Sequence, residues 1–239
     1  MIRNLFILLT ITISGLVTAQ DDGDAIVVME LFTSQGCSSC PPADELLDAI
    51  KEKYEDNNVF VLSYHVDYWN RLGWRDPFSD AAFSDYQRDY AQQFNSRSIY
   101  TPQLVVNGSE HFTGSNSTKA LAAIRKYSTS KIINTIKLTD LKKEDDQIVI
   151  EYNVEGSTFD QVTFALVVSE RTTKIGRGEN RNRTLKNTNI VINRLVKEDV
   201  SGLVTLSIPD WISNNDELLI IAYTQNDELK TTGATKINI

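Results

Sequence analysis

The sequence predicts an α/β domain followed by an all-β sandwich domain. In the first half, apolar runs of strand length alternate with segments of helical periodicity. From residue 131 onward, short strand-like runs follow one another with polar turns between them. We place the α/β domain at residues 24–128 and the sandwich at residues 131–239, with the change of pattern at Ser128–Ser130.

The first nineteen residues have the pattern of an export signal. Arg3 gives a basic start, Leu5–Val17 is apolar apart from Thr, Ser and Gly, and Val17-Thr18-Ala19 fits a cleavage site. An uncleaved membrane anchor is the alternative, but the apolar stretch is shorter than the roughly 20 residues that a spanning helix needs. We therefore expect an exported protein, periplasmic or extracellular, with no membrane span after signal cleavage.

The α/β half begins with a βαβ unit. Ala25–Phe32 is an almost continuous apolar run, which is typical of a strand buried on both faces. From Cys37 onward apolar residues recur at spacings of three and four, which predicts a helix. Its apolar face comprises Leu46, Leu47, Ile50 and Tyr54, and its polar face comprises Asp44, Glu45, Asp48 and Lys51. Val59–Tyr64 is the second apolar strand, and this order implies a parallel sheet.

An aromatic-rich insertion at Asp67–Phe78 follows the second strand. Next comes a helix from about Asp80 to Phe94, capped by Ser79 or Asp80. Leu104–Val106 and Glu110–Thr113 are short strands, and the Asn107-Gly108 pair between them predicts a hairpin turn. A last helix containing Leu121, Ile124 and Tyr127 ends the α/β half.

The second half contains seven strand-length runs and little helical periodicity. They are Ile133–Leu141, Ile148–Val154, Thr163–Val168, Asn189–Leu195, Leu203–Ile208, Leu218–Tyr223 and Thr232–Ile237. Seven short strands separated by polar turns are typical of a β-sandwich.

The overall charge excludes one class of partner. The formal net charge is −8, and lysine and arginine form no continuous basic stripe. Phosphate binding needs clustered positive charge, so we expect no nucleic-acid partner.

Cys37 and Cys40 are the only cysteines, too few for a disulfide framework or a four-ligand zinc site. A cysteine at a helix start is next to unpaired N–H groups and the positive end of the helix dipole, which stabilise a thiolate. A second cysteine one turn later can resolve a mixed disulfide formed on the first. Pro41 and Pro42 fit the first helical turn. We predict a redox pair, and an inert structural disulfide is the alternative.

Several longer stretches resemble the DUF1223 family of exported bacterial proteins. They are residues 28–44, 62–69, 72–78 and 100–103 in the α/β half, and residues 177–180, 183–185 and 189–191 in the second half. The resemblance covers nearly all of the predicted mature chain. That family is similar to thioredoxin in fold, so the resemblance implies a thioredoxin-like domain at residues 24–128.

The similarity to thioredoxin gives Thr101 and Pro102 an expected role in substrate binding. In that superfamily a cis-proline faces the CxxC pair, and the residue before it hydrogen bonds to an extended substrate. Thr101-Pro102 lies at the matching place before Leu104–Val106, so the resemblance implies a cis bond that is otherwise uncommon. Ser38-Ser39 replaces the Gly-Pro that thioredoxin has between its cysteines, which leaves the direction of electron flow open.

The insertion follows the second strand at the sheet edge where the CxxC loop also lies. His65 or Asp67 is a candidate for proton transfer to or from Cys40, and capping of a turn is the alternative for Asp67. Trp69 and Trp74 are candidates for substrate binding, with packing against the sheet as the alternative.

Copper(I) handling is one alternative function, because two thiolates with His65 would suit a soft cation. Exported thioredoxin-like proteins that deliver copper place a histidine late in the domain, whereas His111 falls in the predicted hairpin. A binding module with a structural disulfide is another alternative.

The polar segment Arg171–Asn187 carries Arg171, Arg177, Arg181 and Arg183. We interpret it as a solvated loop, since exposed charge pairs contribute little. The alternative is that it folds back over the CxxC edge to select substrates.

The sequence thus predicts thiol–disulfide exchange, in which Cys37 attacks and Cys40 resolves the mixed disulfide. We expect no cofactor and no metal. The expected partners are exported protein thiols or disulfides, or small thiols, together with a redox-recycling protein.

Overall fold

The computed structural model describes residues 25–55 and 57–239, so the predicted export signal at residues 1–19 lies outside the described residues. The helices are α1 (Pro41–Lys53), α2 (Ala81–Gln93) and α3 (Ser117–Tyr127), with a 3₁₀ turn at Asn70–Leu72. The strands of the first half are β1 (Val27–Thr33), β2 (Val59–His65), β3 (Gln103–Val106) and β4 (Glu110–Thr113). Those of the second half are β5 (Asn134–Glu144), β6 (Gln147–Gly156), β7 (Gln161–Lys174), β8 (Thr184–Lys197), β9 (Ser201–Ser207), β10 (Leu218–Gln225) and β11 (Thr231–Asn238). Within the described residues, no helix combines the length and apolar character needed to cross a membrane.

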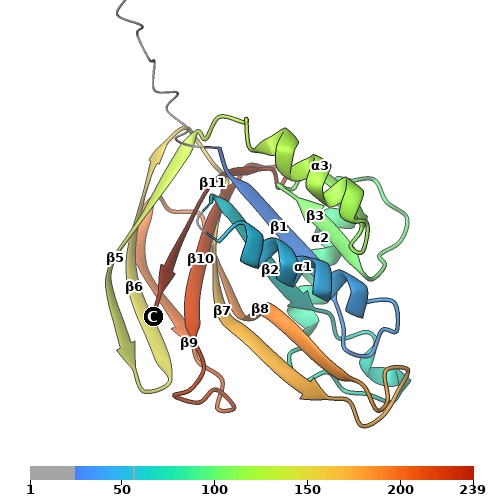
Figure 1. The fold of residues 1–239 in the computed structure, drawn as a ribbon. Coiled ribbons are helices and arrows are strands. Elements are labelled where there is room, and N and C mark those ends of the chain that lie inside the picture. Colours follow the sequence, from blue (N-terminus) through green and yellow to red (C-terminus); the bar gives the residue numbers. More distant parts are fainter. Residues whose placement is uncertain (1–24, 56) are drawn as a thin grey trace, which may run out of the picture.

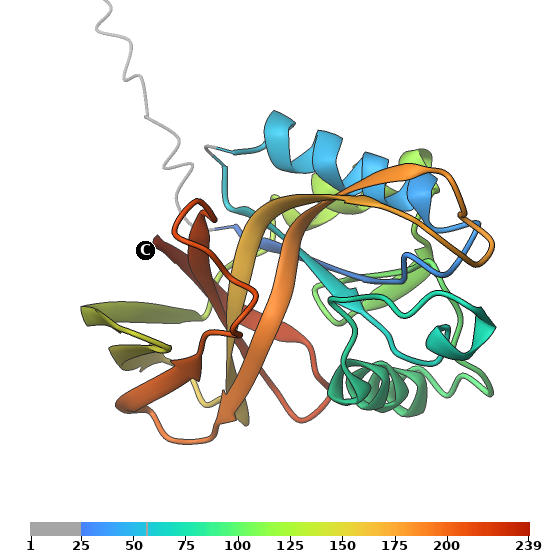
Figure 2. The same ribbon diagram turned by 90° about the horizontal axis from the view of Figure 1, so that it is seen from below.

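The βαβ start is confirmed. β1 and β2 pair in parallel, and every residue of β1 is buried. Its side chains alternate between two cores, with Met29 and Leu31 packing under α1 and α3, and Val28 and Phe32 facing α2. Helices α1 and α3 therefore cover one face of the sheet and α2 covers the other (Figures 1 and 2).

The predicted hairpin turn between β3 and β4 is also confirmed. Asn107 and Gly108 both have positive φ, 48° and 59°, as a two-residue turn of this kind requires. A side chain at Gly108 would collide with the Leu229 carbonyl oxygen, 1.8 Å from its Cβ. The turn thus sets the position of β4, and it also packs against the connection between β10 and β11.

All seven strands predicted in the second half are present. β5, β6 and β9 form a separate antiparallel sheet. An apolar core fills the space between this sheet and one face of β7, β8 and β10, with Ile148, Ile150 and Leu206 on one side and Phe164, Leu166 and Ile220 on the other. The fold class is therefore confirmed as an α/β sheet with a βαβ start plus a second, separate β-sheet.

The larger sheet of this sandwich continues into the α/β half, which the sequence did not predict. Its eight strands have the order β11-β10-β7-β8-β2-β1-β3-β4. The junction is a parallel pairing of β8 with β2 through Ser63 and Ile190. Without β8, the edge of β2 would have unpaired backbone groups, and β8 covers this edge. The domain boundary at residues 128–131 stays a prediction.

The β7–β8 hairpin extends from the sandwich to the loop that carries Cys37 and Cys40. Each of its strands is 14 residues long. In Figures 1 and 2 the two orange strands run beside α1, and their tip, residues 175–183, reaches the loop before that helix.

Candidate functional site

Cys37 and Cys40 form a disulfide at the N-terminus of α1, with 5.4 Å between their Cα atoms. Cys40 is the residue that precedes the helix, and its carbonyl accepts hydrogen bonds from the Ala43 and Asp44 amides. Pro41 and its neighbour occupy the first turn, where no intrahelical N–H bond is lost. The predicted cysteine pair at the helix start is therefore confirmed.

Both cysteines are fully buried, with 0% of each side chain exposed. The hairpin tip at 175–183 lies against the loop that carries them. Glu179 accepts a hydrogen bond from the Ser38 amide at 3.1 Å. Asn180, itself buried, donates from Nδ2 to the carbonyl oxygens of Gln35 and Cys37 at 2.9 and 2.8 Å.

The interpretation of Arg171–Asn187 as a solvated loop was wrong. Its two ends, residues 171–174 and 184–187, belong to β7 and β8, and the tip between them folds over the CxxC edge. The asparagine amide explains the difference, because it donates to the Gln35 carbonyl and adds a second donor to the Cys37 carbonyl, which also accepts the Cys40 amide. The tip is thus one of the segments that enclose the loop carrying the two buried sulfurs.

The peptide bond between Thr101 and Pro102 is cis, as expected. Pro102 accepts a hydrogen bond from the Gly114 amide at 2.9 Å. A Cβ on Gly114 would lie 3.1 Å from the Ala43 side chain and 3.2 Å from that of Pro102, so the cis-proline lies close to the first turn of α1. The role of Thr101 and Pro102 in holding substrate stays a prediction.

Both tryptophans of the insertion pack around the CxxC loop. The Trp69 indole donates to Thr101 Oγ1 at 2.7 Å, and its Cβ approaches Gly36 so closely that a side chain there would lie 3.3 Å away. The Trp74 indole donates to Gln35 Oε1 at 3.2 Å. They link the loop before Cys37 with the cis-proline on one side and the insertion on the other, and their substrate-binding role stays a prediction.

His65 and Asp76 form a buried pair behind this loop. His65 Nδ1 is 2.7 Å from Asp76 Oδ2, which also accepts the Gln35 amide at 2.8 Å. Burial lowers the pKa of His65, but Asp76 and Asp44 beside it more than offset this, so the pKa lies above its usual value. Asp67 has different partners, since its carboxylate accepts a hydrogen bond from Ser84 of α2 at 2.5 Å. Proton transfer by either residue stays a prediction.

Asp44 is a residue that the sequence analysis placed on the polar face of the first helix, and that placement was wrong. The side chain is only 4% exposed. It lies one turn after Cys40 and one turn before Leu47, on the buried face of α1, and this spacing was the signal that could have found it. Burial raises the pKa of Asp44 to about 7, although His65 and a hydrogen bond from Thr33 act against the shift.

Four buried polar atoms in this region have no hydrogen-bond partner among the described residues. They are Asp44 Oδ1, Ser63 Oγ, His65 Nε2 and Asn187 Nδ2. Buried groups of this kind are usually satisfied by internal water. The compartment behind the disulfide is therefore polar and suited to holding or passing a proton.

The copper(I) alternative finds no support in the geometry. Within residues 25–55 and 57–239, no group of three or more His, Cys, Asp or Glu side chains is arranged to hold a metal ion. His65 is paired with Asp76, and His111 on β4 is within 2.9 Å of the Tyr100 hydroxyl.

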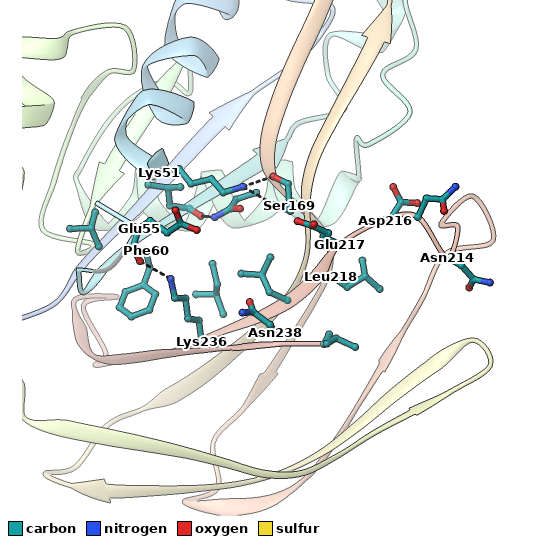
Figure 3. Close-up of a pocket in the computed structure, with 17 residues that line it drawn as sticks. Lys51, Glu55, Phe60, Ser169, Asn214, Asp216, Glu217, Leu218, Lys236 and Asn238 are labelled. Atoms are coloured by element: carbon teal, nitrogen blue, oxygen red, sulfur yellow. Dashed lines mark hydrogen bonds between the residues drawn. The ribbon is translucent and has the colours of Figure 1, made fainter. Parts of the chain in front are cut away.

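A cavity of about 550 Å³ lies at the other end of α1 (Figure 3). Lys51, three turns beyond Cys40 and thus roughly 16 Å along the helix, projects over it and donates to the Ser169 carbonyl and hydroxyl at 2.9 and 2.8 Å. Phe60, Leu219 and Ile221 line it as well. This cavity contains residues from both halves of the chain and is separate from the disulfide.

Comparison with known proteins assigns the chain to a family. The model of the family described as "Protein of unknown function (DUF1223)" matches residues 28–225, and the chain belongs to this family. The X-ray crystal structure of protein AGR_C_4864 from Agrobacterium tumefaciens is similar, with a TM-score of 0.64, 26% sequence identity, and coverage of 90% of this chain and 95% of that chain. A DUF3823 family protein from Bacteroides ovatus reaches a TM-score of only 0.23 at 15% identity, over 43% of this chain and 55% of that chain. No curated protein matches the chain.

Proposed function

We propose that this member of the DUF1223 family is a thiol–disulfide exchange protein of the thioredoxin-like superfamily. The observation that carries the proposal is the Cys37–Cys40 disulfide at the N-terminus of α1, next to a cis-proline. The helix N-terminus favours a thiolate on the cysteine pair. The pair can therefore pass between dithiol and disulfide without a change in the helix.

The exchange proceeds in two balanced steps. The Cys37 thiolate attacks one sulfur of a substrate disulfide, forming a mixed disulfide and releasing the other substrate sulfur as a thiolate. Cys40 then attacks the Cys37 sulfur, which re-forms the intramolecular disulfide and releases the second substrate thiolate. Two electrons pass from the protein to the substrate, and the proton of Cys40 passes to the nearby polar compartment. The reverse sequence oxidises a substrate dithiol.

Asp44 is the group that we assign to hold this proton, with His65 and Asp76 behind it. Asp44 lies one turn beyond Cys40, and the pKa of about 7 that burial gives it is suited to accept and return a proton near neutral pH. This assignment replaces Asp67 with Asp44 and retains His65.

Exchange also requires the hairpin tip to move. Both sulfurs are covered, and the contacts from Glu179 and Asn180 are hydrogen bonds that open without breaking a strand pairing. We propose that the tip opens when substrate binds, and that Thr101 and Pro102 then hold the substrate segment. The proposed substrates are exported protein thiols or disulfides, or small thiols, in the periplasm or outside the cell, with a separate protein recycling the pair.

A redox titration of the protein lacking residues 1–19 tests the proposal. The thiol state of the pair is followed against defined glutathione and dithiothreitol ratios, with Cys37→Ser and Cys40→Ser as controls. We expect a potential between about −120 and −270 mV, the span of exchange catalysts. A potential below about −300 mV, which is typical of structural disulfides, would contradict it.

A binding module with a structural disulfide is the second candidate. Complete burial of the disulfide and the separate cavity of about 550 Å³ favour it. In that case the Cys37→Ser, Cys40→Ser double variant loses stability but keeps whatever the cavity binds. Measurable exchange of the wild-type pair with glutathione at neutral pH distinguishes the first candidate from the second.

A further inference from the structure

The surface around the buried disulfide has a charge opposite to that of the whole chain. Five of the ten arginines in the described residues lie on two short segments, residues 71–75 and 177–183. We call them the arginine rim, and they are Arg71, Arg75, Arg177, Arg181 and Arg183. All five are exposed. The chain as a whole carries a net charge of −8, so this concentration of positive charge is local.

The two segments meet directly beside the CxxC loop. A Cβ on Gly73 would lie 3.7 Å from Gly178, and one on Gly178 would lie 3.1 Å from the Trp74 side chain. Trp74 in turn contacts the loop before Cys37 through Gln35, and Asn180 contacts it from the hairpin tip. The rim therefore lies beside the CxxC loop, on the hairpin tip that moves in the proposed exchange and on the segment next to it.

Few acidic groups offset the rim. Glu179 is the exposed carboxylate within the two segments, and it accepts the Ser38 amide. Asp76 is buried against His65. Asp67 lines a shallow surface pocket together with Arg71 and Arg75, and its carboxylate is bound to Ser84 of α2. Arg183 also lines a pocket with Glu45 and Asp48, and Asp48 is paired with Lys186. The other four guanidinium groups thus face the solvent with two partly engaged carboxylates, Asp67 and Glu179, among them.

We infer that the site selects thiols and disulfides that carry carboxylate groups near the reacting sulfur. Arginine binds carboxylates with two parallel N–H···O bonds, and a rim of like charge raises the local concentration of an anionic substrate. This inference rests on the proposed exchange function and specifies its substrate class. The carboxylates belong either to a small thiol such as glutathione or to acidic residues beside the cysteine of a partner protein.

The test compares three small disulfides with the wild-type protein: anionic glutathione disulfide, neutral hydroxyethyl disulfide and cationic cystamine. Because their leaving thiols differ in reactivity, each rate is compared only with itself across salt concentrations and variants. We expect the glutathione disulfide rate to fall between about 0.02 and about 0.5 M salt, the cystamine rate to rise, and the neutral rate to stay constant.

The variant carrying Arg71→Gln, Arg75→Gln, Arg177→Gln and Arg181→Gln should lower the glutathione disulfide rate roughly tenfold or more, since each exposed charge contributes about two- to fivefold. It should leave the neutral rate unchanged. Arg183 is retained because it contacts Asn180. The control is Arg125→Gln with Lys143→Gln, both exposed, one in the last turn of α3 and the other on β5. Two mixed-disulfide peptides of equal length, one with Asp and Glu beside the cysteine and one with Asn and Gln, show whether a protein segment is also selected.

Two outcomes would overturn the inference. If rates with all probes respond equally to salt and to the variant, charge selection is absent while exchange itself stands. If no probe exchanges, the proposed function fails, and the rim is tested separately by an NMR titration with redox-inert S-methylglutathione and its neutral diethyl ester. Equal shifts for acid and ester then overturn the inference, and shifts for the acid alone, lost in the arginine variant, support it.

Discussion

Asp44 is enclosed between α1 and the end of β1, with few groups to stabilise its charge. Of its two oxygens, Oδ2 accepts a hydrogen bond from Thr33 and Oδ1 has no partner among the described residues. His65 is the cation that faces it and Asp76 the nearest anion. Because the pKa rises from 3.8 to about 7 on folding, the folded protein retains a proton near pH 5.5 that the unfolded chain has lost.

The stability of the protein should therefore fall as pH rises through this range. The contribution of Asp44 is complete below pH 4, where both states are protonated, and it is lost as pH rises through about 7. Asp44→Asn removes the effect, so its stability relative to wild type should increase by up to about 4 kcal/mol between pH 4 and pH 8. Urea unfolding of the oxidised proteins at several pH values measures this.

The control for Asp44 is Asp48→Asn, which changes a partly exposed carboxylate one turn later on the same helix. Its stability difference from wild type should vary much less with pH. Asp44→Asn also removes one of the charges that raise the pKa of His65, so the difference from wild type reports Asp44 and His65 as a coupled pair. A constant difference between Asp44→Asn and wild type at all pH values would disprove the assignment of a raised pKa.

Among single residues, the sequence identifies those whose role depends on their neighbours in the chain. The CxxC spacing is sufficient to predict the disulfide, and Thr101-Pro102 could be placed from a resemblance. Asp44 and Asp76 were missed for a physical reason, because an aspartate in a helix or a turn is usually exposed and its burial depends on what packs over it. Asp44 is buried against the end of β1, and Asp76 against His65 at the end of β2, and in neither case is the partner near in the sequence.

In the proposed exchange, the tip of the β7–β8 hairpin limits access to the disulfide. Asn180 donates two hydrogen bonds to the CxxC loop, and net values of about 0.5–1.5 kcal/mol per bond predict that their loss opens the tip more often. Asn180→Ala should therefore speed reduction of the disulfide by dithiothreitol about tenfold. Following free thiol with time at fixed dithiothreitol measures this.

Thr172→Ala on the same hairpin is the control for Asn180→Ala. Thr172 is exposed and lies on β7 outside the tip, so its reduction rate should equal that of wild type. Urea unfolding of both variants shows whether faster reduction reflects global instability. Equal reduction rates for Asn180→Ala and wild type would mean that the tip does not limit access.

Sequence periodicity located the cores of β7 and β8 but not their outer parts. Thr163–Val168 and Asn189–Leu195 were predicted, and both strands continue into the polar segment 171–187. Outside the sandwich these extensions are polar apart from Leu185, so they show no sustained alternation of apolar and polar residues. The pairing of two such strands depends on the shared hairpin, which no short-range pattern reveals.

The two halves of the molecule share a buried polar cluster as well as a sheet. Glu30 on β1 is fully buried and accepts hydrogen bonds from Tyr86 and Tyr90 of α2 and from Tyr223 of β10. Burial raises the pKa of Glu30 despite these three donors and the charge of Arg194. The guanidinium of Arg194 on β8 lies 3.7 Å from the centre of the Tyr86 ring. Residues far apart in the sequence thus share one carboxyl group as their hydrogen-bond acceptor.

This connection between the two halves was not predictable from composition or periodicity. The sequence indicates two consecutive units, because helices cease after residue 128 and strands follow. The link between β2 and β8 is a pairing of Ser63 with Ile190 alone, and nothing in either strand specifies the other as its neighbour. Glu30 was the one charged residue in an apolar strand. A buried carboxyl group needs a polar partner, so this residue predicts that such a partner exists but does not identify it.

If the cluster couples the halves, a change in the second half should loosen the first. Tyr223→Phe removes one donor to Glu30 and should cost about 1–3 kcal/mol, because a hydrogen bond to a buried acceptor is lost. Hydrogen exchange should then accelerate in α2, which contains Tyr86 and Tyr90, as well as in β10. Tyr152→Phe is the matched control, since it removes a hydrogen bond to the Asp199 carbonyl in the separate three-stranded sheet. If Tyr223→Phe instead leaves hydrogen exchange in α2 at the wild-type rate, the two halves open independently and the cluster does not couple them.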